Sequence, residues 1–459
     1  MKKILSIVLL SMIIVACGGN NDSSSKHSSN QIPSSSVKPS SSETPNSPSS
    51  SFIKEKGYIY DEQDLINIKN DLSGTYYLAN NISLTKAWTP IGDKENPFIG
   101  SIEGNGYEIK NLKITDSLTM TEEVSSVGRD FISVGGFIGY LKGQVKNLKI
   151  TNYEIKIENQ LPSIKNFNSQ TTEYKVFVGA LVGINKGTIN NCHSEGVLEV
   201  GSTSLIGRGR LGGLVGKNEA TITNSSSKGN IKGTFTHENI RGGGLVGASE
   251  GGEISTSWSS CNVTLNDQNG KAIAGGLVGM VEFSDINNCY ATGNISTSSN
   301  KASTAGGLIG LIDATVAGST IVNKSYATGT LNANAIEKSS YAGGLVGNCE
   351  VLISGSTGLV GSVTLSNSFY SGSKITSRAT NKAHGGAIIS CVEGNTADHT
   401  IDVSNCNYLK GVSLIINGIS ESKENKQGES LSSINELVAS VNLDDQVWNI
   451  TNDNLPTLK

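Results

Sequence analysis

Gly212-Gly213-Leu214-Val215-Gly216 is the most informative part of the sequence about the fold, because the chain repeats it. GGLVG recurs at residues 243, 275 and 343, and GGLIG begins at residue 306. Variants begin at Gly135 (GGFIG) and Gly179 (GALVG), and GGAII at Gly385 closes the series. Successive copies lie 44, 33, 31, 32, 31, 37 and 42 residues apart. Eight copies with a period near 32 indicate one structural unit repeated along the chain.

Each unit contains short apolar runs separated by Gly, Asn and Ser turns, without a stretch of helical period. A unit of this size cannot bury its apolar face alone, but stacked neighbours form one continuous core. We therefore predict an all-β solenoid, a right-handed parallel β-helix of about nine to ten coils with one repeat per coil.

The composition agrees with this fold class. The 459 residues include 54 Gly and 8 Pro, and 17% are charged. Apolar residues make up 36%, which together with Gly suffices for a globular core. The net charge is −4 and no Lys/Arg block stands out, so nucleic acid is not an expected partner.

A second string follows the pentapeptides, as in Ile189-Asn190-Asn191-Cys192-His193. Its third position is Asn in most copies, and aligned positions become columns in a stack. Asn tolerates the left-handed backbone region, and stacked amides can hydrogen-bond between coils. We interpret the column as a structural ladder at a corner, with a ligand-binding row as the alternative. Its members are Asn111, Asn147, Asn191, Asn224, Asn288, Asn367 and Asn405.

Four aromatic residues form a second column two places further on: Trp258, Tyr290, Tyr326 and Phe369. A stripe spaced at about 4.8 Å could offer a platform to sugar rings or to a partner protein. Packing against the coil wall or under a loop is the other interpretation.

Both ends of the solenoid need protection, because open coils present unpaired strand edges. In the region 52–100, Asp61 is a helix N-cap candidate ahead of Leu65 and Ile68. The repeats are expected to span residues 101–417. In the region 418–459 that follows them, Ser433 and Glu436 fit a capping box. We expect small helical caps at both ends.

The N-terminal residues 1–17 have the features of a secretory signal, with Lys2 and Lys3 ahead of an apolar run of about 12 residues. The run ends in Ile14-Val15-Ala16-Cys17, which resembles a bacterial lipobox. The resemblance implies that Cys17 is lipidated and anchors the mature chain, and Gly18 favours the outer membrane. Residues 18–51 contain 15 Ser and 4 Pro, and we expect a disordered tether.

Six further cysteines lie in an exported setting where disulfides form. Cys349 and Cys391 both stand six places after the first Gly of adjacent pentapeptides, so a disulfide between them is one prediction. Cys192, Cys289 and Cys406 share a column and are expected to be small buried residues. No CxxC occurs, so no zinc or other metal site is predicted.

The pentapeptides and the strings that follow them resemble the GLUG repeat family, over roughly residues 100–410. Such repeats occur in bacterial surface proteins and in part of some immunoglobulin A peptidases. The chain contains no HExxH motif, so the zinc peptidase chemistry of some relatives is not expected here.

We therefore predict a lipid-anchored surface protein whose β-helix is a non-catalytic binding or adhesion module, without cofactors. The expected partners are the membrane, through the anchor, and a glycan or a host or surface protein. One alternative is a polysaccharide lyase or glycosidase, since parallel β-helices carry such activities. Its candidate residues do not repeat in one column of the sequence: Asp285, Asp313, Arg208, Arg210 and Arg241. A structural envelope spacer is a third interpretation.

Overall fold

The computed structural model describes residues 54–459, with gaps at 116–117, 126–127, 159–171, 203–207, 237–238, 316–317, 352–360, 395–399, 419 and 424–427. The predicted signal 1–17 with Cys17 and the tether 18–51 lie outside the described residues.

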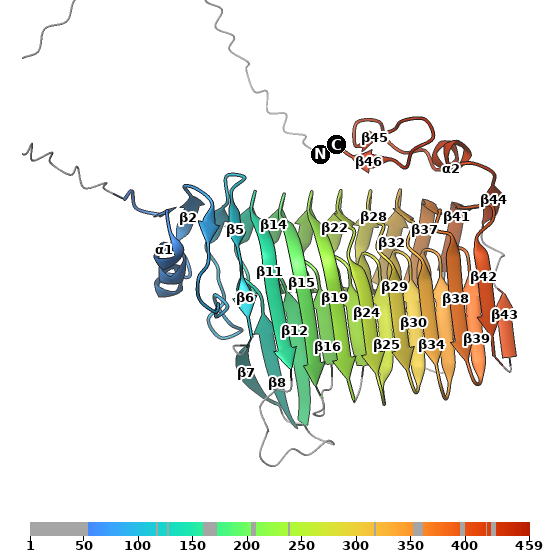
Figure 1. The fold of residues 1–459 in the computed structure, drawn as a ribbon, viewed down its shortest axis with the longest axis horizontal. Helices are drawn as coiled ribbons and strands as arrows, with labels where there is room; N and C mark the ends of the chain where they lie inside the picture. Colours follow the sequence, from blue (N-terminus) through green and yellow to red (C-terminus); the bar gives the residue numbers. More distant parts are fainter. Residues whose placement is uncertain are drawn as a thin grey trace, which may run out of the picture. The chain divides into compact units, whose positions relative to one another are not determined.

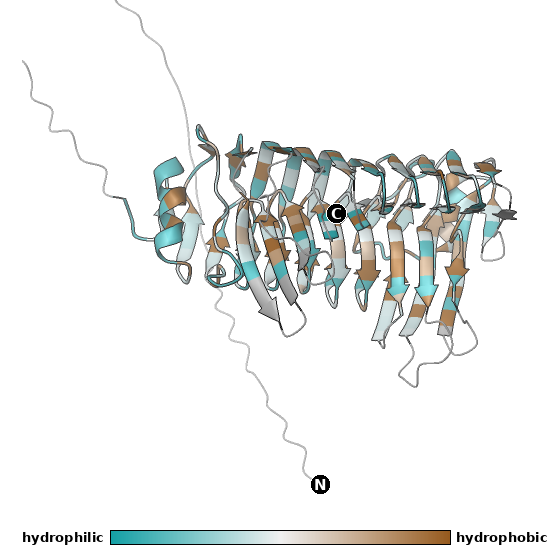
Figure 2. Ribbon diagram, turned by 90° about the horizontal axis from the view of Figure 1, so that it is seen from below, coloured by the Kyte–Doolittle hydropathy of each residue, from teal (hydrophilic) through white to brown (hydrophobic). Residues whose placement is uncertain are grey.

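The described chain is a parallel β-helix, as predicted. Each coil contributes strands to a ten-stranded, an eight-stranded and a 26-stranded sheet, and equivalent strands of successive coils pair in parallel (Figure 1). The 26-stranded sheet contains two ladders, one of short strands and one of long strands. Along long-ladder strands such as β24 (Asn262–Asp267), buried and exposed residues alternate, so one side of the strand points into the core. Strands of the ten-stranded and eight-stranded sheets are buried along most of their length. Figure 2 shows how hydrophobic and hydrophilic residues are distributed over the coils.

The ten-stranded sheet comprises β7 (Thr119–Ser125), β8 (Gly128–Gly135), β12 (Thr172–Gly179), β16 (Arg208–Gly212), β20 (Asn239–Gly243), β25 (Lys271–Gly275), β30 (Ala302–Gly306), β35 (Ser339–Gly343), β39 (Lys382–Gly386) and β43 (Ser420–Lys423). Only the pairing of β7 with β8 is antiparallel in this sheet. The eight-stranded sheet comprises β9 (Ile138–Leu141), β13 (Val182–Asn185), β17 (Val215–Asn218), β21 (Val246–Glu250), β26 (Val278–Glu282), β31 (Ile309–Ala314), β36 (Val346–Val351) and β40 (Val392–Glu393).

The short ladder comprises β1 (Tyr58–Ile59), β2 (Thr75–Leu78), β4 (Ser101–Glu103), β10 (Gln144–Lys146), β14 (Thr188–Asn190), β18 (Thr221–Thr223), β22 (Glu253–Ser255), β27 (Asp285–Asn287), β32 (Gly318–Asn323), β37 (Gly361–Tyr370) and β41 (Thr400–Leu409). The last two strands continue past the corner. The long ladder comprises β3 (Ile82–Ser83), β5 (Glu108–Lys110), β6 (Lys113–Ile114), β11 (Lys149–Glu158), β15 (His193–Ser202), β19 (Ser226–Phe235), β23 (Trp258–Ser259), β24 (Asn262–Asp267), β28 (Tyr290–Ala291), β29 (Ile295–Ser299), β33 (Tyr326–Ala327), β34 (Leu331–Ala335), β38 (Lys374–Ala379), β42 (Ser413–Asn417) and β44 (Glu429–Leu431).

The pentapeptide forms the corner between the ten-stranded and eight-stranded sheets. Its first Gly ends one strand, and its fourth residue begins the next, as Gly306 and Ile309 do. Leu308 and Ile309 are both fully buried because they stand on either side of this bend, not on one strand. Their N–H groups both donate to the Leu345 carbonyl of the next coil, at 3.0 and 2.9 Å.

Backbone contact between coils explains why the motif requires glycine. A Cβ on Gly307 would overlap the carbonyl oxygen of Gly344, one coil further on. A Cβ on Gly306 would overlap the Ile309 carbonyl of its own corner, and one on Gly310 would approach the Gly279 carbonyl of the preceding coil. The second glycines of four neighbouring repeats meet the same obstacle: Gly213, Gly244, Gly276 and Gly344. The corner therefore has no room for side chains at these positions.

The last repeat is shifted by one residue from the predicted alignment. Gly343 pairs with Gly386, and Gly385 pairs with Ala342. The equivalent of GGLVG is therefore Gly386-Ala387-Ile388-Ile389-Ser390, and Cys349 pairs with Val392.

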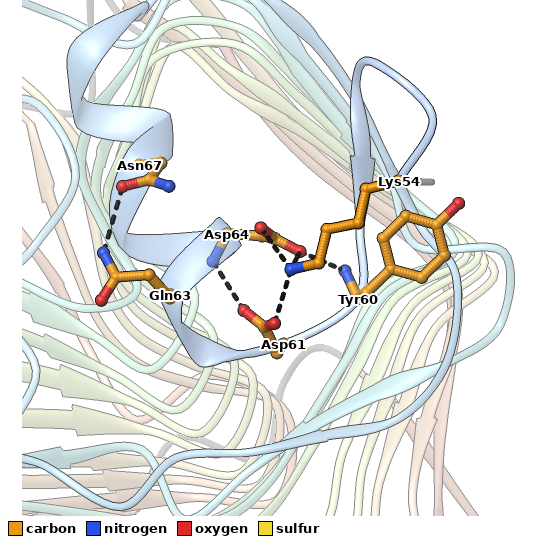
Figure 3. Close-up of polar contacts among 6 residues, drawn as sticks. All are labelled: Lys54, Tyr60, Asp61, Gln63, Asp64 and Asn67. Carbon is orange, nitrogen blue, oxygen red and sulfur yellow. Dashed lines mark hydrogen bonds and ion pairs between the residues drawn. The ribbon is translucent and has the colours of Figure 1, made fainter. Parts of the chain in front are cut away.

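The N-terminal region 52–100 caps the stack and also supplies its first coil. α1 (Glu62–Asn67) and the 3₁₀ helix η1 (Ile68–Asn70) place Leu65 and Ile68 in the main core. Asp61 accepts a hydrogen bond from the Asp64 N–H at 3.0 Å, and Lys54 bridges both carboxylates (Figure 3). The Lys54 hydrogen bond lowers the pKa of Asp61. β2 and β3 already pair with β4 and β5, so the stack begins before the predicted boundary at residue 101.

The C-terminal region 418–459 differs from the predicted end cap. β43 and β44 still pair with β39 and β41 of the last coils. α2 (Ile434–Ser440) begins at the predicted cap, where the Ser433 hydroxyl accepts from the Glu436 N–H at 3.2 Å. It is followed by the antiparallel pair β45 (Trp448–Asn449) and β46 (Thr457–Leu458). These elements lie alongside the coils and not across the open end (Figure 1).

We predict that Gly307→Ala lowers the free energy of unfolding by roughly 1–3 kcal/mol, because the new methyl group separates two coils. The control is Gly201→Ala, whose Cβ meets only an ordinary contact of 3.5 Å with the Thr234 carbonyl oxygen. Denaturant unfolding followed by circular dichroism measures both. Equal stability of the two variants would contradict the role assigned to the glycine corner.

Candidate binding surfaces

The four predicted aromatic residues form a continuous stack across successive coils. Ring centroids are 5.6 Å apart from Trp258 to Tyr290, 5.0 Å from Tyr290 to Tyr326, and 4.8 Å from Tyr326 to Phe369. The ring planes are parallel within 3°. Register pairing of the strands therefore places the rings one above another.

The stack is covered, so the interpretation of this column as packing under another segment is confirmed for three of its four rings, and the alternative of a platform for sugars or a partner protein is wrong for them. Tyr326 and Phe369 expose 1% and 0% of their surface, and Tyr290 exposes 9%, whereas Trp258 is half-buried. The covering residues come from the C-terminal segment 433–459 and include Leu437, Val441 and Trp448.

Two polar contacts hold this segment on the stack. The Tyr326 hydroxyl donates to the Pro456 carbonyl at 2.6 Å, and the Trp448 indole N–H donates to Asn288 Oδ1 at 3.2 Å. Burial raises the pKa of Tyr290 to about 12 and that of Tyr326 further. The aromatic column is thus a buried interface between the coils and the C-terminal segment 433–459.

The predicted asparagine column adopts positive φ angles at every coil, between 48° and 61°. Thr256 and Lys324, which interrupt the Asn pattern, have the same conformation. Side-chain amide bonds join only some neighbours: Asn191 donates to Asn147 at 2.7 Å, and Asn405 donates to Asn367 at 3.2 Å. The column is therefore uniform in backbone conformation but not in side-chain bonding.

From Asn191 onwards, the residue after each corner position is a buried Cys or Ser, whereas Leu112 and Leu148 stand there in the first two coils. Several of the serines complete the corner's hydrogen bonds. The Ser225 hydroxyl accepts from the Cys192 N–H at 3.1 Å and donates to the Thr223 carbonyl at 2.7 Å. In the same way, the Ser325 hydroxyl accepts from the Cys289 N–H at 3.1 Å. Burial raises the pKa of the Cys192 and Cys289 thiols to about 12, so both remain protonated.

The predicted disulfide between Cys349 and Cys391 is not formed in the structure. Because of the one-residue shift, Cys349 lies opposite Val392. The backbones of the two cysteines are in contact, since the Cys349 N–H donates to the Cys391 carbonyl at 3.1 Å.

A row of six half-buried carboxylates runs along the eight-stranded sheet, and sequence reasoning missed it. Each stands seven residues after the first Gly of its repeat once the last copy is aligned in its observed register. Pairs such as Glu250 with Glu282 and Asp313 with Glu350 are in register. We name Glu219, Glu250, Glu282, Asp313, Glu350 and Glu393 the acidic row. The five candidates named from the sequence do not share one column, since Asp285 lies on the short ladder, but Asp313 belongs to the acidic row.

Basic side chains from the ten-stranded and the eight-stranded sheet lie beside the acidic row. Arg210 pairs in register with Arg241, and Lys217 forms an ion pair with Glu250 at 2.7 Å. Burial alone would raise the pKa of Glu250, but Lys217 and the arginines lower it. Burial and the adjacent carboxylates raise the pKa of Glu282. Within the described residues, no cluster of His, Cys, Asp and Glu is arranged to hold a metal ion.

The outer face of the long ladder is polar and open to solvent. In β24, Asn262, Thr264 and Asn266 are exposed, whereas the intervening Val263 and Leu265 are buried in the core. The same alternation continues in β29 and β34. This face combines exposure with regular spacing, as a binding surface requires.

We predict that Trp448→Ala releases the C-terminal segment while the coils stay folded, because Trp448 packs against Tyr290 and Tyr326 at centroid distances of 6.1 and 5.9 Å. Protease cleavage in segment 433–459 and binding of a hydrophobic dye should both increase, with an unchanged β-sheet circular dichroism spectrum. Ile450→Ala is the control, since Ile450 is 44% exposed. Unchanged cleavage in Trp448→Ala would show that other contacts hold the segment.

A family model described as "The GLUG motif" matches residues 207–232 and 272–296. A "Putative Gly-rich membrane protein" from Evansella cellulosilytica (strain ATCC 21833 / DSM 2522 / FERM P-1141 / JCM 9156 / N-4) is 32% identical over 152 residues, which are 31% of this chain and 15% of that protein. Among solved structures, an "IgA1 Protease" chain is similar with 18% identity and a TM-score of 0.44, over 87% of this chain and 25% of that one. The chain thus spans a quarter or less of either protein. The matched residues contain the corners that begin at Gly212 and Gly275, so the chain contains GLUG motifs.

Proposed function

We propose that this chain is an exported, lipid-anchored surface protein whose β-helix is a non-catalytic binding or adhesion module. The exposed polar face of the long ladder carries this proposal. Its strands hold their side chains in fixed register because the alternate residues are locked in the core. A rigid, preorganised face loses little conformational entropy when a partner binds.

The anchor and the tether support display at a surface. The lipobox-like sequence ending in Cys17 precedes a Ser/Pro-rich stretch, which as a flexible coil would reach on the order of 30 Å. A relative that shares part of the chain carries "membrane protein" in its name. None of the helices in the described part of the chain is long and apolar enough to cross a membrane.

We predict that Cys17→Ala moves the protein from the detergent phase to the aqueous phase in a phase-partition assay, because the acylated residue is lost. Cells that display the wild-type protein should adhere to other cells or surfaces, and the variant should lose this adhesion by release from the membrane. A variant that still partitions into detergent would refute the anchor. Adhesion equal to that of cells lacking the protein would favour a structural spacer.

A glycan-cleaving enzyme is the second candidate, and the acidic row is the observation that favours it. Glu250 and Glu282 are neighbours in register, and their pKa values move in opposite directions. Glycosidases use one ionised and one protonated carboxyl group, often about 5 Å apart.

For the non-catalytic proposal, we predict no release of reducing ends or unsaturated products from polysaccharides by the wild-type protein. The matched variant is Glu282→Gln, which keeps the side-chain shape and removes the titrating proton. Product formation by the wild type that falls at least about 100-fold in Glu282→Gln would replace the binding proposal with the enzymatic one.

A further inference from the structure

We infer that the central part of the long ladder binds an uncharged polysaccharide that lies along the axis of the solenoid. This inference rests on the proposed function and names the ligand class for its polar face. It concerns nine side chains on three successive coils, which we name the polar array. They are Asn262, Thr264 and Asn266, then Asn294, Ser296 and Ser298, then Thr330, Asn332 and Asn334.

The strand register arranges these residues as a grid. Thr264 pairs with Ser296, which pairs with Asn332. Asn266, Ser298 and Asn334 form the next column in the same way. All nine side chains are exposed or half-buried. The residues between them, such as Leu265 and Leu331, expose 1% of their surface and point into the core.

Hydrogen bonds between neighbouring coils order the array. Ser298 donates to Asn266 at 3.1 Å, and Asn332 Nδ2 donates to the Ser296 hydroxyl at 3.3 Å. Asn294 Oδ1 accepts from both the backbone and the hydroxyl of Thr330, at 2.9 and 2.8 Å. Amides and hydroxyls have more donor and acceptor sites than these bonds use, so each column retains capacity for a ligand.

Charge distinguishes the array from the coils directly on either side of it. Its nine members are neutral, whereas the coils on both sides carry charges. On the N-terminal side, Lys232 is paired with Glu199 and lies in register with Thr264. On the C-terminal side, Arg378 lies in register with Asn334. A neutral surface that both donates and accepts hydrogen bonds matches a ligand rich in hydroxyls and without charge, because a charged group would lose hydration without gaining an ion pair.

The spacing of the grid favours a polymer with a short repeat. Equivalent side chains recur about every 4.8 Å across the strands, which is close to the length of one sugar ring. A polysaccharide that crosses the strands would meet the same column at each successive sugar. The side-by-side packing of β24, β29 and β34 provides this direction along the stack (Figure 1).

The test uses the full-length protein in affinity electrophoresis with a soluble neutral β-glucan, a neutral mannan and the polyanion alginate. The variant Thr264→Glu/Asn334→Glu places two charges in the array at exposed positions. The control Ser319→Glu/Asn452→Glu adds the same charge at exposed positions of β32 and the C-terminal segment. The conservative variant Thr264→Ser keeps the hydroxyl. Thermal melting confirms that every variant is folded.

We expect wild type, control and Thr264→Ser to bind a neutral polysaccharide with an affinity that is unchanged between about 50 and about 500 mM salt. The array variant should bind at least about tenfold more weakly. Three outcomes would overturn the inference: no binding to either neutral polymer, equal binding by the wild type and the array variant, or salt-sensitive binding to alginate alone. If cells displaying the protein still adhere in those cases, the ligand class fails and the proposed function stands.

Discussion

Close backbone contact between coils at the glycine corners shapes the whole solenoid. At corners such as that of Gly307, the carbonyl of the next corner lies where a Cβ would stand, so glycine allows the closest approach, and Ala180 and Ala387 are the largest residues at this position. The sharp bend also lets two consecutive apolar residues, such as Leu308 and Ile309, both enter the core. A regular solenoid with short repeats follows from these two effects.

Stacking converts a repeated residue into a column, and the surroundings of each column decide what it does. The aromatic column becomes a buried interface because the C-terminal segment packs on it. The acidic row is half-buried and partly neutralised by Lys217 and Arg210. The polar array stays accessible, since its side chains are exposed or half-buried. The three columns have the same spacing between coils, but they differ in residue type and in whether other residues bury them.

Much of the fold could be predicted from the sequence because its determinants are local and repeated. The period of GGLVG indicated the parallel β-helix, and the corner Asn residues adopt the left-handed conformation that their side chains tolerate. Ser433 and Asp61 begin helices where their capping patterns stand. The candidate site was harder to predict. One extra residue shifted the last repeat, which separated Cys391 from its expected place and hid the sixth carboxylate of the acidic row.

The period, the glycine corners, the asparagine conformation and the helix starts follow from the amino-acid sequence, since each depends on a residue and its near neighbours. Which columns are exposed depends on long-range packing. Tyr326 is covered by a contact with Pro456, 130 residues away in the chain. No local pattern specifies such a contact, because it arises when an apolar segment packs on an apolar surface that distant coils form together.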